Sequence, residues 1–316
     1  MKSKWLITGG AGYIGSHIAA LAARANIDIL VIDDLSTGFF ENIEAPVEFE
    51  QISLLDKGFP KILSQWKPST IVHCAGIKYA RLSIANPLPF YERNTIATFS
   101  LAKALQEFKI NNLIFSSSCS VYGNPDYIPV NEQTPLKPIS PYGNSKLAAE
   151  KMLSEFSVST NINFTSIRYF NVAGNEPGKQ DRSEFNLFPI LKNVFENNLD
   201  FHIRGENLNT YDGTPVRDYI DVRDVATAHI LIGQKMESCD KSFGPLNLST
   251  GIPKSVYEIF VAFRKFYPNW NGRLIYEELR TGDPVCIYGS SDLITRVSGW
   301  QPKYDLDSMV SSIVFS

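Results

Sequence analysis

A cluster of glycines directly after a short apolar segment near the N-terminus constrains the fold of this chain most strongly. Lys4–Thr8 has the composition of a buried strand, and residues from about 13 to 25 carry apolar side chains at helical spacing. Between them, Gly9, Gly12 and Gly15 follow a GxxGxxG pattern. Glycines at this spacing permit a tight turn, a close approach of backbone amides to a pyrophosphate, and close packing of helix on strand. The segment therefore predicts a dinucleotide-binding strand–turn–helix unit.

Further short apolar segments alternate with helical patterns along the first half of the chain. Strands are predicted at Ile29–Asp33, Thr70–Ala75, Leu113–Ser117 and Phe164–Arg168, with a helix around Asn94–Phe108. This alternation is typical of an α/β protein with a doubly wound parallel sheet that helices cover on both faces. In such sheets ligands bind at the carboxyl ends of the strands, where the strand order reverses.

The composition changes after the strand at Phe164–Arg168. Residues 171–186 are rich in Gly, Pro, Asn and charge, and shorter elements with turns at 212–215 and 281–284 follow. We therefore predict a nucleotide-binding domain over residues 1–170 and a smaller mixed α/β substrate-binding lobe over residues 171–316. Segments of the lobe are expected to return to the first domain.

Charge and cysteine content exclude several classes of function. The 316 residues carry a formal net charge of -3, which argues against a nucleic-acid partner. Apolar runs are too short for a membrane span, and the N-terminus does not have the apolar stretch of a signal peptide. The cysteines form no CxxC pair and the histidines no HxxxH or HExxH spacing. We therefore expect reduced thiols, a cytoplasmic location and no metal site.

An acidic residue at the end of the second predicted strand indicates the cofactor. Asp33 follows Gly15 by 18 residues, a position from which a carboxylate can accept both ribose hydroxyls of adenosine. Together with Asp34 it would repel a 2′-phosphate. We therefore expect NAD as the cofactor, and not NADP.

A second motif, SPYGNSK at residues 140–146, has the pattern of a proton-transfer site. Pro141 suits the first turn of a helix, and Tyr142 and Lys146 then lie one turn apart on the same face. A lysine ammonium near a phenol stabilises the phenolate, so we expect Lys146 to lower the pKa of Tyr142 from its usual value of about 10. Ser118, after another predicted strand, could hydrogen-bond the substrate oxygen that Tyr142 deprotonates.

These motifs resemble those of a known family, the extended short-chain dehydrogenases, and within it the UDP-galactose 4-epimerases. The resemblance extends from about Lys4 to Trp300. It is carried by several segments in the family's order: TGGAGYIGSH (8–17), HCAGIK (73–78), SSSCSVYG (116–123), SPYGNSK (140–146), RYFNVAG (168–174), DGTPVRDYI (212–220) and RTGD (280–283).

The resemblance implies a Rossmann-type fold, NAD as the cofactor, and Ser118, Tyr142 and Lys146 as the catalytic residues. Contacts with the cofactor are expected from the glycine turn, the strand ends and the helix of the second motif. These residues are Gly9, Gly12, Tyr13, Ile14, Gly15, Asp33, Asp34, Ser53, Leu54, Cys74, Ala75, Gly76, Lys78, Asn94, Ser116, Tyr142, Lys146, Tyr169 and Phe170. Ser53 stands where the family commonly has an aspartate facing adenine, and it is a weaker acceptor.

The resemblance also implies a set of contacts with a nucleotide sugar. The implied residues are Lys78, Ser118, Tyr142, Asn171, Asn186, Leu187, Arg204, Arg217, Arg280, Asp283 and Ile287. Arg217 and Arg280 each offer a planar fork of donors that suits a diphosphate. Arg204 stands where many members place an aromatic ring against uracil, and a guanidinium can stack there too.

The activity implied by the resemblance is NAD-dependent 4-epimerisation of a UDP-hexose through a transient 4-keto sugar. The 4,6-dehydratases of the family carry Asp-Glu after the catalytic Ser or Thr, whereas this chain has Cys119-Ser120, so dehydration is disfavoured. Two alternatives stay open: another sugar-nucleotide oxidoreductase (a 4-reductase or decarboxylase), and a non-catalytic NAD-sensing protein. The pathway also stays open between galactose metabolism and surface polysaccharide synthesis.

Two finer expectations concern substrate breadth and assembly. The family's tyrosine that excludes an N-acetyl group aligns with about Ile287, so we expect activity on both UDP-glucose/galactose and the N-acetyl pair. Relatives pack two helices per subunit into a four-helix bundle, so we expect a homodimer. The corresponding apolar positions are Ala97, Leu101, Leu105, Leu147 and Met152, although the same helix faces could equally belong to the core.

Overall fold

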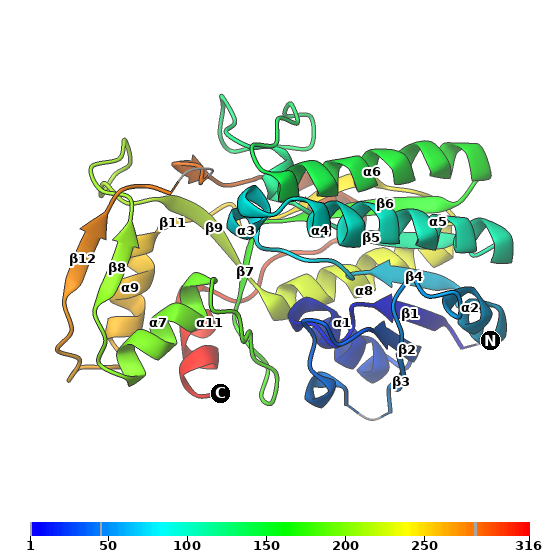
Figure 1. Cartoon of the computed structure of the whole chain (residues 1–316), viewed down its shortest axis with the longest axis horizontal. Helices are drawn as coiled ribbons and strands as arrows, with labels where there is room; N and C mark the ends of the chain where they lie inside the picture. Colours follow the sequence, from blue (N-terminus) through cyan, green and yellow to red (C-terminus); the bar gives the residue numbers. More distant parts are fainter. Residues whose placement is uncertain (1, 45, 281–282) are drawn as a thin grey trace.

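Seven parallel strands form the central sheet of the protein (Figure 1). The computed structural model describes residues 2–44, 46–280 and 283–316. The strand order is β10-β6-β5-β4-β1-β2-β3, and every neighbouring pair is parallel. The bounds are β1 Lys4–Thr8, β2 Asp28–Asp33, β3 Glu48–Gln51, β4 Thr70–His73, β5 Asn112–Ser118, β6 Asn163–Tyr169 and β10 Gly244–Leu248. The order reverses between β1 and β4, which is where such a sheet binds its ligands.

Helices cover both faces of this sheet and bury an apolar core on each. One face carries α1 (Tyr13–Arg24), α8 (Val222–Cys239) and α10 (Asp292–Ser298), packed around Trp5 and Ile18. The other carries α2 (Phe59–Trp66), α5 (Ala97–Phe108) and α6 (Pro141–Thr160), packed around Leu6 and Leu101. Because both faces are covered, the residues of the central strands are buried almost throughout, polar ones included. The α/β fold with a doubly wound parallel sheet, predicted from the sequence, is confirmed.

The remaining elements build a smaller lobe beside the sheet, at the left of Figure 1. Strands β7 (Asn171–Ala173), β9 (Val216–Asp221), β11 (Pro253–Ser255) and β13 (Cys286–Ile287) form one small sheet, and β8 (Phe201–Arg204) pairs with β12 (Leu274–Glu277). Helices α7 (Leu187–Glu196), α9 (Val256–Arg264) and α11 (Leu306–Val314) enclose a core around Phe188, Phe195 and Phe263. β10, α8 and α10 also come from the second half of the chain but lie with the large sheet. The division at residue 170 stays a prediction.

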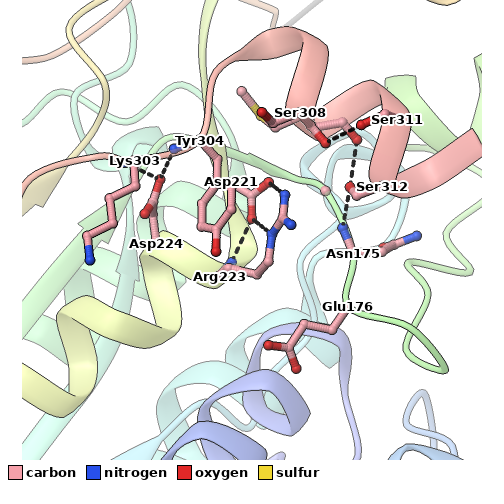
Figure 2. A network of polar contacts seen from close by, with 12 residues as sticks. Asn175, Glu176, Asp221, Arg223, Asp224, Lys303, Tyr304, Ser308, Ser311 and Ser312 are labelled. Atoms are coloured by element: carbon pink, nitrogen blue, oxygen red, sulfur yellow. Dashed lines mark hydrogen bonds and ion pairs between the residues drawn. The ribbon is translucent and has the colours of Figure 1, made fainter.

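Polar contacts fasten the C-terminal segment to α8 and to the loop after β7 (Figure 2). The Asp224 carboxylate of α8 accepts hydrogen bonds from the backbone N–H groups of Lys303, at 3.0 Å, and Tyr304, at 3.1 Å. The Ser312 hydroxyl of α11 accepts one from the backbone N–H of Asn175, at 3.0 Å. Helix α11 therefore contacts both the core of the smaller lobe and the loop that follows β7.

The helices between β4 and β6 differ from the sequence prediction in one respect. Short helices α3 (Ala80–Ala85) and α4 (Leu88–Tyr91) lead into a π-helical turn, η2 (Glu92–Ile96), before α5 begins. Of the positions proposed for a dimer interface, Ala97, Leu101 and Leu105 are buried in the core on α5, and Leu147 is buried in a separate apolar cluster. These side chains therefore face the interior of the protein and not a partner subunit. None of the helices in the described part of the chain is both long and apolar enough to cross a bilayer.

A buried ion pair fixes the long helix α6 against the sheet. Glu150 of α6 pairs with Arg168 of β6, and these side chains are 8% and 3% exposed. The Ser117 hydroxyl of β5 donates to Glu150 Oε2 at 2.6 Å, and Arg168 Nη1 donates to the Tyr122 hydroxyl at 2.9 Å. Each charge thus has several partners, which offsets the cost of removing it from water. Glu150 consequently sets the position of α6 along β5.

Glu150→Ala should lower the free energy of unfolding by about 3–5 kcal/mol, because it leaves the Arg168 guanidinium buried without its counter-ion. Asp126→Ala is the control, since Asp126 pairs with Lys137 at 3.5 Å where both side chains are well exposed. That change should cost less than about 1 kcal/mol. Urea unfolding followed by circular dichroism measures both. Equal losses in the two variants would show that the buried pair does not fix α6.

Candidate active site

A cavity of about 460 Å³ opens at the carboxyl ends of the central strands. It is lined by Gly9 after β1, Asp33 at the end of β2, Cys74 after β4, and Ser116 near the end of β5. Tyr142 and Lys146 of α6 line it as well. The strand ends that meet here flank the point where the sheet order reverses, so the cavity lies where the topology predicts a ligand site.

The glycine turn after β1 forms one wall of this cavity. Gly9 has a φ of 66°, and a Cβ there would lie 2.6 Å from the backbone of Ala75. A Cβ on Gly15 would collide with the carbonyl oxygen of Gly9. Helix α1 starts at Gly12 without a capping side chain, so its first N–H groups are left for a partner. A pyrophosphate suits such a cradle because it is small, anionic and rich in acceptors.

Asp33 both holds the glycine turn in place and lines the cavity. Its carboxylate accepts hydrogen bonds from the backbone N–H groups of Ala11, at 3.0 Å, and Leu35, at 2.9 Å, while still lining the cavity. Burial raises the pKa of Asp33, and these backbone hydrogen bonds oppose the rise. The residue thus holds the glycine turn and faces the cavity with a carboxylate, as an adenosine ribose requires.

The neighbouring carboxylate is engaged with a residue that no sequence motif marks. Arg93 of η2 pairs with Asp34 at 3.1 Å and donates to the Ser36 hydroxyl at 2.6 Å. Burial alone would raise the pKa of Asp34, but its hydrogen bonds with Ser36 and the contact with Arg93 outweigh this effect and lower it. Asp34 therefore faces a cation inside the protein, which leaves Asp33 as the carboxylate available to a ribose.

Helix α6 brings the proton-transfer residues together. Ser140 caps the helix by accepting a hydrogen bond from the Gly143 N–H at 3.1 Å, and Pro141 occupies its first turn. Tyr142 and Lys146 follow one turn apart, and both are buried. The Lys146 ammonium donates to the Ser116 carbonyl of β5 at 2.9 Å. The helix start and the strand end therefore meet at the cavity floor.

The pKa values differ from the prediction that Lys146 lowers that of Tyr142. Burial raises the pKa of Tyr142 to about 12, partly opposed by a hydrogen bond with Ser118. Lys146 is not among the groups that shift the pKa of Tyr142, and its ammonium donates to the Ser116 carbonyl. Burial lowers the pKa of Lys146 itself to about 8. The protein's own groups therefore do not activate the phenol, and the prediction is wrong on this point.

A buried polar chain supports the cavity from behind. Asn94 Nδ2 donates to the Ser145 hydroxyl at 3.0 Å, and Asn94 Oδ1 accepts from the Ile77 N–H at 2.9 Å. His73 lies between the hydroxyls of Thr8, at 2.7 Å, and Thr98, at 2.8 Å, and burial lowers its pKa to about 3. These groups satisfy one another within the protein. Asn94 thus braces the segment after β4 and the catalytic helix.

Most of the residues expected to contact the cofactor line the cavity. The two that do not are Asn94, which is bonded behind it, and Phe170, which is buried in a cluster with Val121 and Leu147. The residues brought together are Gly9, Gly12, Tyr13, Ile14, Gly15, Asp33, Asp34, Ser53, Leu54, Cys74, Ala75, Gly76, Lys78, Ser116, Tyr142, Lys146 and Tyr169. Their place around one cavity fits a role in cofactor binding. That role stays a prediction.

The residues expected to contact the sugar nucleotide lie mostly outside this cavity, in the smaller lobe. Arg217 of β9 lies close enough to Cys119, the neighbour of Ser118, to act on its thiol electrostatically. Burial lowers the pKa of Arg280, and the nearby Arg204 and Arg81 lower it further. Three guanidinium groups thus lie near one another. Such a cluster is relieved by an anion of high charge.

The other positions from this set are scattered around the lobe. Arg204 also pairs with Glu277 across β8 and β12. Asn186 precedes α7 and donates to Asp181, while Leu187 begins that helix. Asn171 is exposed at the start of β7, Asp283 is half-buried, and Ile287 is buried next to Phe170 in the same apolar cluster. Thr281 and Gly282 of the RTGD motif lie outside the described residues.

Several cavity residues had no sequence signal. Gln180, Asp181, Arg182 and Ser183 line the cavity although they belong to the loop after β7, whose composition predicts a lobe boundary. Arg81 of α3 joins the guanidinium cluster from a segment without a motif. A charged loop rich in Gly and Asn has no periodicity from which its place in the fold could be predicted.

Known proteins resemble this chain in both sequence and structure. A sequence model of the NAD dependent epimerase/dehydratase family matches residues 5–244. The UDP-glucose 4-epimerase of Lacticaseibacillus casei is 35% identical over 316 residues, which cover 97% of this chain and 94% of that protein.

Solved structures agree over the whole chain. The UDP-glucose 4-epimerase from Brucella ovis, crystallised in complex with NAD, is 31% identical, with a TM-score of 0.93 and coverage of 99% of this chain and 97% of that one. The UDP-Glc/GlcNAc 4-epimerase from Campylobacter jejuni is 32% identical, with a TM-score of 0.87 and coverage of 99% and 98%.

Lys146→Met should stabilise the fold by about 1–3 kcal/mol at pH 7, because it removes a buried ammonium whose pKa the fold lowers. The unfolded chain keeps this lysine protonated up to about pH 10.5, whereas the folded protein releases the proton near pH 8. The wild-type stability therefore rises relative to the variant between these two values. Urea unfolding of both proteins at pH 7 and pH 10 measures the difference. A variant less stable than wild type at pH 7 would show that the buried ammonium does not destabilise the fold.

Proposed function

Because the chain belongs to the NAD-dependent epimerase/dehydratase family, we propose that it is an NAD-dependent epimerase that inverts C4 of a UDP-hexose. The observation that carries the proposal is the junction of two sites. The glycine cradle with Asp33 and the Tyr142–Lys146 pair line one cavity, and Ser118, which does not line it, contacts Tyr142. The first suits a dinucleotide, and the second suits proton transfer at a hydroxyl beside it.

The cofactor supplies a hydride acceptor and donor, and its oxidised nicotinamide carries a positive charge. Tyr142 takes the proton of the C4 hydroxyl and returns it after the sugar has turned. Its hydrogen bond with Ser118 lowers its pKa slightly, and burial raises it to about 12, so the protein alone keeps the phenol protonated. Removal of the Tyr142 proton therefore needs a further positive charge beside the phenol, which an oxidised nicotinamide would supply.

Ser118 and Lys146 hold the reacting groups in place. Ser118 ends β5, and its hydroxyl also caps the short 3₁₀ turn η3 (Cys119–Val121) by accepting from the Ser120 N–H at 3.2 Å. This fixes the oxygen that would share the substrate hydroxyl with Tyr142. Lys146, anchored on the Ser116 carbonyl, directs its remaining ammonium protons towards the cavity that it lines. They are suited to the hydroxyls of a ribose.

The guanidinium groups of Arg81 and of the smaller lobe suit the diphosphate of a nucleotide sugar. Arg217 and the cluster of Arg81, Arg204 and Arg280 come from four different segments. Among the described residues, Arg81 and Arg280 form no ion pair with a carboxylate. A diphosphate would relieve their mutual repulsion and gain bidentate hydrogen bonds. A sugar held through its diphosphate is free to rotate, as inversion at C4 requires.

Dehydration is not supported by the residues after Ser118. Burial raises the pKa of the Cys119 thiol to about 12, so this group is a poor acid or base at neutral pH. Ser120 is engaged by Ser118, at 3.1 Å between the two hydroxyls. No group at these positions can remove water from the sugar. This favours oxidation and re-reduction at a single carbon.

We also propose activity on both plain and N-acetylated UDP-hexoses. The similarity to a UDP-Glc/GlcNAc 4-epimerase supports this breadth. Ile287, the aligned gate position, is only 3% exposed and packs in a cluster with Val121 and Leu147. A tyrosine there would overpack this core, so Ile287→Tyr is not a clean test of the gate. Direct assay of UDP-glucose, UDP-galactose and their N-acetyl forms decides the point.

Tyr142→Phe should lower turnover by at least about 10²–10⁴, because it removes the proton acceptor. The variant should fold normally and still bind NAD, since only one hydroxyl is lost. Chromatographic separation of the UDP-hexoses measures turnover, and thermal unfolding checks the fold. Tyr91→Phe, on the partly exposed α4, is the matched control and should leave turnover unchanged.

Product analysis also separates the alternatives. Epimerisation produces no net NADH, whereas a reductase or decarboxylase changes the cofactor or the carbon skeleton. Near-normal turnover of Tyr142→Phe would remove this residue from the mechanism. Absence of any product with all four UDP-hexoses would reject the proposed function.

The proposed location is the cytoplasm and the proposed assembly is a homodimer. The thiols of Cys74, Cys119, Cys239 and Cys286 are all free, as a reducing compartment favours. Although the inward side chains of α5 belong to the core, Phe99 of α5 and Ile96, the last residue of η2 just before it, are each 53% exposed, and Leu88 of α4 is more so. Large apolar groups concentrated on one helical surface are typical of an interface.

Phe99→Glu combined with Ile96→Glu should therefore shift the protein towards monomer, because two charges would be buried at the helix–helix contact. Sedimentation velocity at micromolar concentration measures the mass. Ile252→Glu is the control, since Ile252 is similarly exposed apolar surface in a turn of the other lobe. A wild-type monomer under these conditions, or a double variant that stays dimeric, would contradict the proposed interface.

A further inference from the structure

The loop between β7 and α7 makes a set of contacts that epimerisation at C4 does not require. We call residues 174–183 the strap. Four of its members line the cofactor cavity opposite the strand ends: Gln180, Asp181, Arg182 and Ser183. The strap therefore belongs to the wall of the site although it comes from the other half of the chain.

The start of the strap is anchored beside the glycine turn. The Tyr13 hydroxyl at the beginning of α1 donates to the Gly174 carbonyl. The Glu176 N–H donates to His17 Nε2 at 3.1 Å, and the Asn175 N–H donates to Ser312 of α11 at 3.0 Å. Figure 2 shows Asn175 and Glu176 between the C-terminal helix and α1. This end is thus held by several independent hydrogen bonds.

Lys179 fastens the strap to the segment after β2. Its side chain is 1% exposed, and its ammonium donates to the Asn42 carbonyl at 3.2 Å and pairs with Glu44. Asn42 in turn donates from Nδ2 to the Ala11 carbonyl of the glycine turn, at 2.9 Å. A buried ammonium is stable only with such partners. Lys179 therefore connects the strap to the cradle through a single side chain.

The far end of the strap contacts the segment after β4. Asp181 pairs with Lys78 at 3.3 Å, and the Arg182 guanidinium lies 4.3 Å from the centre of the Phe39 ring. The cavity opens between the ends of β2 and β4, on either side of β1. The strap is thus fastened to residues that follow both strands, and four of its own residues line the cavity between them.

We propose that the strap is the barrier to release of the cofactor and that Lys179 is its fastener. The inference rests on the proposed function, because an epimerase oxidises and re-reduces the same substrate and has no need to exchange its cofactor. Lys179 is not among the residues that line the cavity. Lys179 instead limits the movement of the strap. The cofactor leaves only when the contacts of Lys179 with Asn42 and Glu44 are broken.

Lys179→Met should accelerate dissociation of NAD by about 10- to 100-fold, the effect of losing a hydrogen-bonded buried charge. Methionine keeps the length of the side chain in the buried site. Protein loaded with NAD is mixed with an auxiliary dehydrogenase and its substrate, so that released NAD⁺ is reduced and its appearance gives the dissociation rate. Stopped-flow quenching of tryptophan fluorescence gives the association rate, which should rise as well because the same barrier limits entry.

Two further variants keep the test independent of folding defects. Glu44→Gln changes a half-exposed partner of Lys179 and should accelerate release in the same direction. Lys254→Met is the matched control, since Lys254 is a partly buried lysine of the same lobe that pairs with Glu258 at 3.1 Å and does not line the cavity. Its release rate should equal that of wild type.

The possible outcomes separate this inference from the proposed function. If wild type binds no NAD, the proposed function itself is rejected. If it binds NAD and epimerises UDP-hexoses, but Lys179→Met and Glu44→Gln release NAD at the wild-type rate, the strap inference alone is overturned. Faster release with an unchanged association rate would also overturn it, because Lys179 would then be a binding contact and not a fastener.

Discussion

The contact of α6 with β5 is the interaction on which the rest of the site depends. Three successive strand residues meet the helix: Ser116 accepts from Lys146, Ser117 donates to Glu150, and Ser118 bonds to Tyr142. A change in the position of the helix along the strand would separate all three pairs together. The buried Glu150–Arg168 pair opposes such a change because separating two buried opposite charges is costly.

In this arrangement burial shifts the pKa values of Tyr142 and Lys146, each in the direction that favours the uncharged form. Burial raises the pKa of Tyr142 to about 12 and lowers that of Lys146 to about 8. The protein thus tolerates a costly ammonium at neutral pH, and it does not by itself release the phenolic proton. The phenol therefore needs a further positive charge beside it before it can act as a base. Lys146 thus lowers the stability of the fold, although it is one of the residues proposed for activity.

The two halves of the chain share the site unequally. The first half supplies the cradle and the proton-transfer groups at the strand ends. The second half supplies Arg204 and Arg280 of the guanidinium cluster, beside Arg81 from the first half, and it also supplies the strap. The strap reaches back to Asn42 and Glu44, so residues more than a hundred positions apart close the same space. An enzyme that regenerates its cofactor in every turnover is suited to such a closure.

The sequence by itself predicted five strands of the large sheet, the glycine turn, and the spacing of Tyr142 and Lys146 on one helix, because these depend on local patterns along one strand or one helix. Tertiary structure alone decided the protonation of Tyr142 and Lys146, since burial is a property of the packed molecule. It also turned Ala97, Leu101 and Leu105 from surface candidates into core. The sequence did not predict the places of Arg81, Arg93 and the strap. Contacts such as that of Lys179 with Asn42 join segments that are distant in the sequence, and no local pattern indicates that they lie close together.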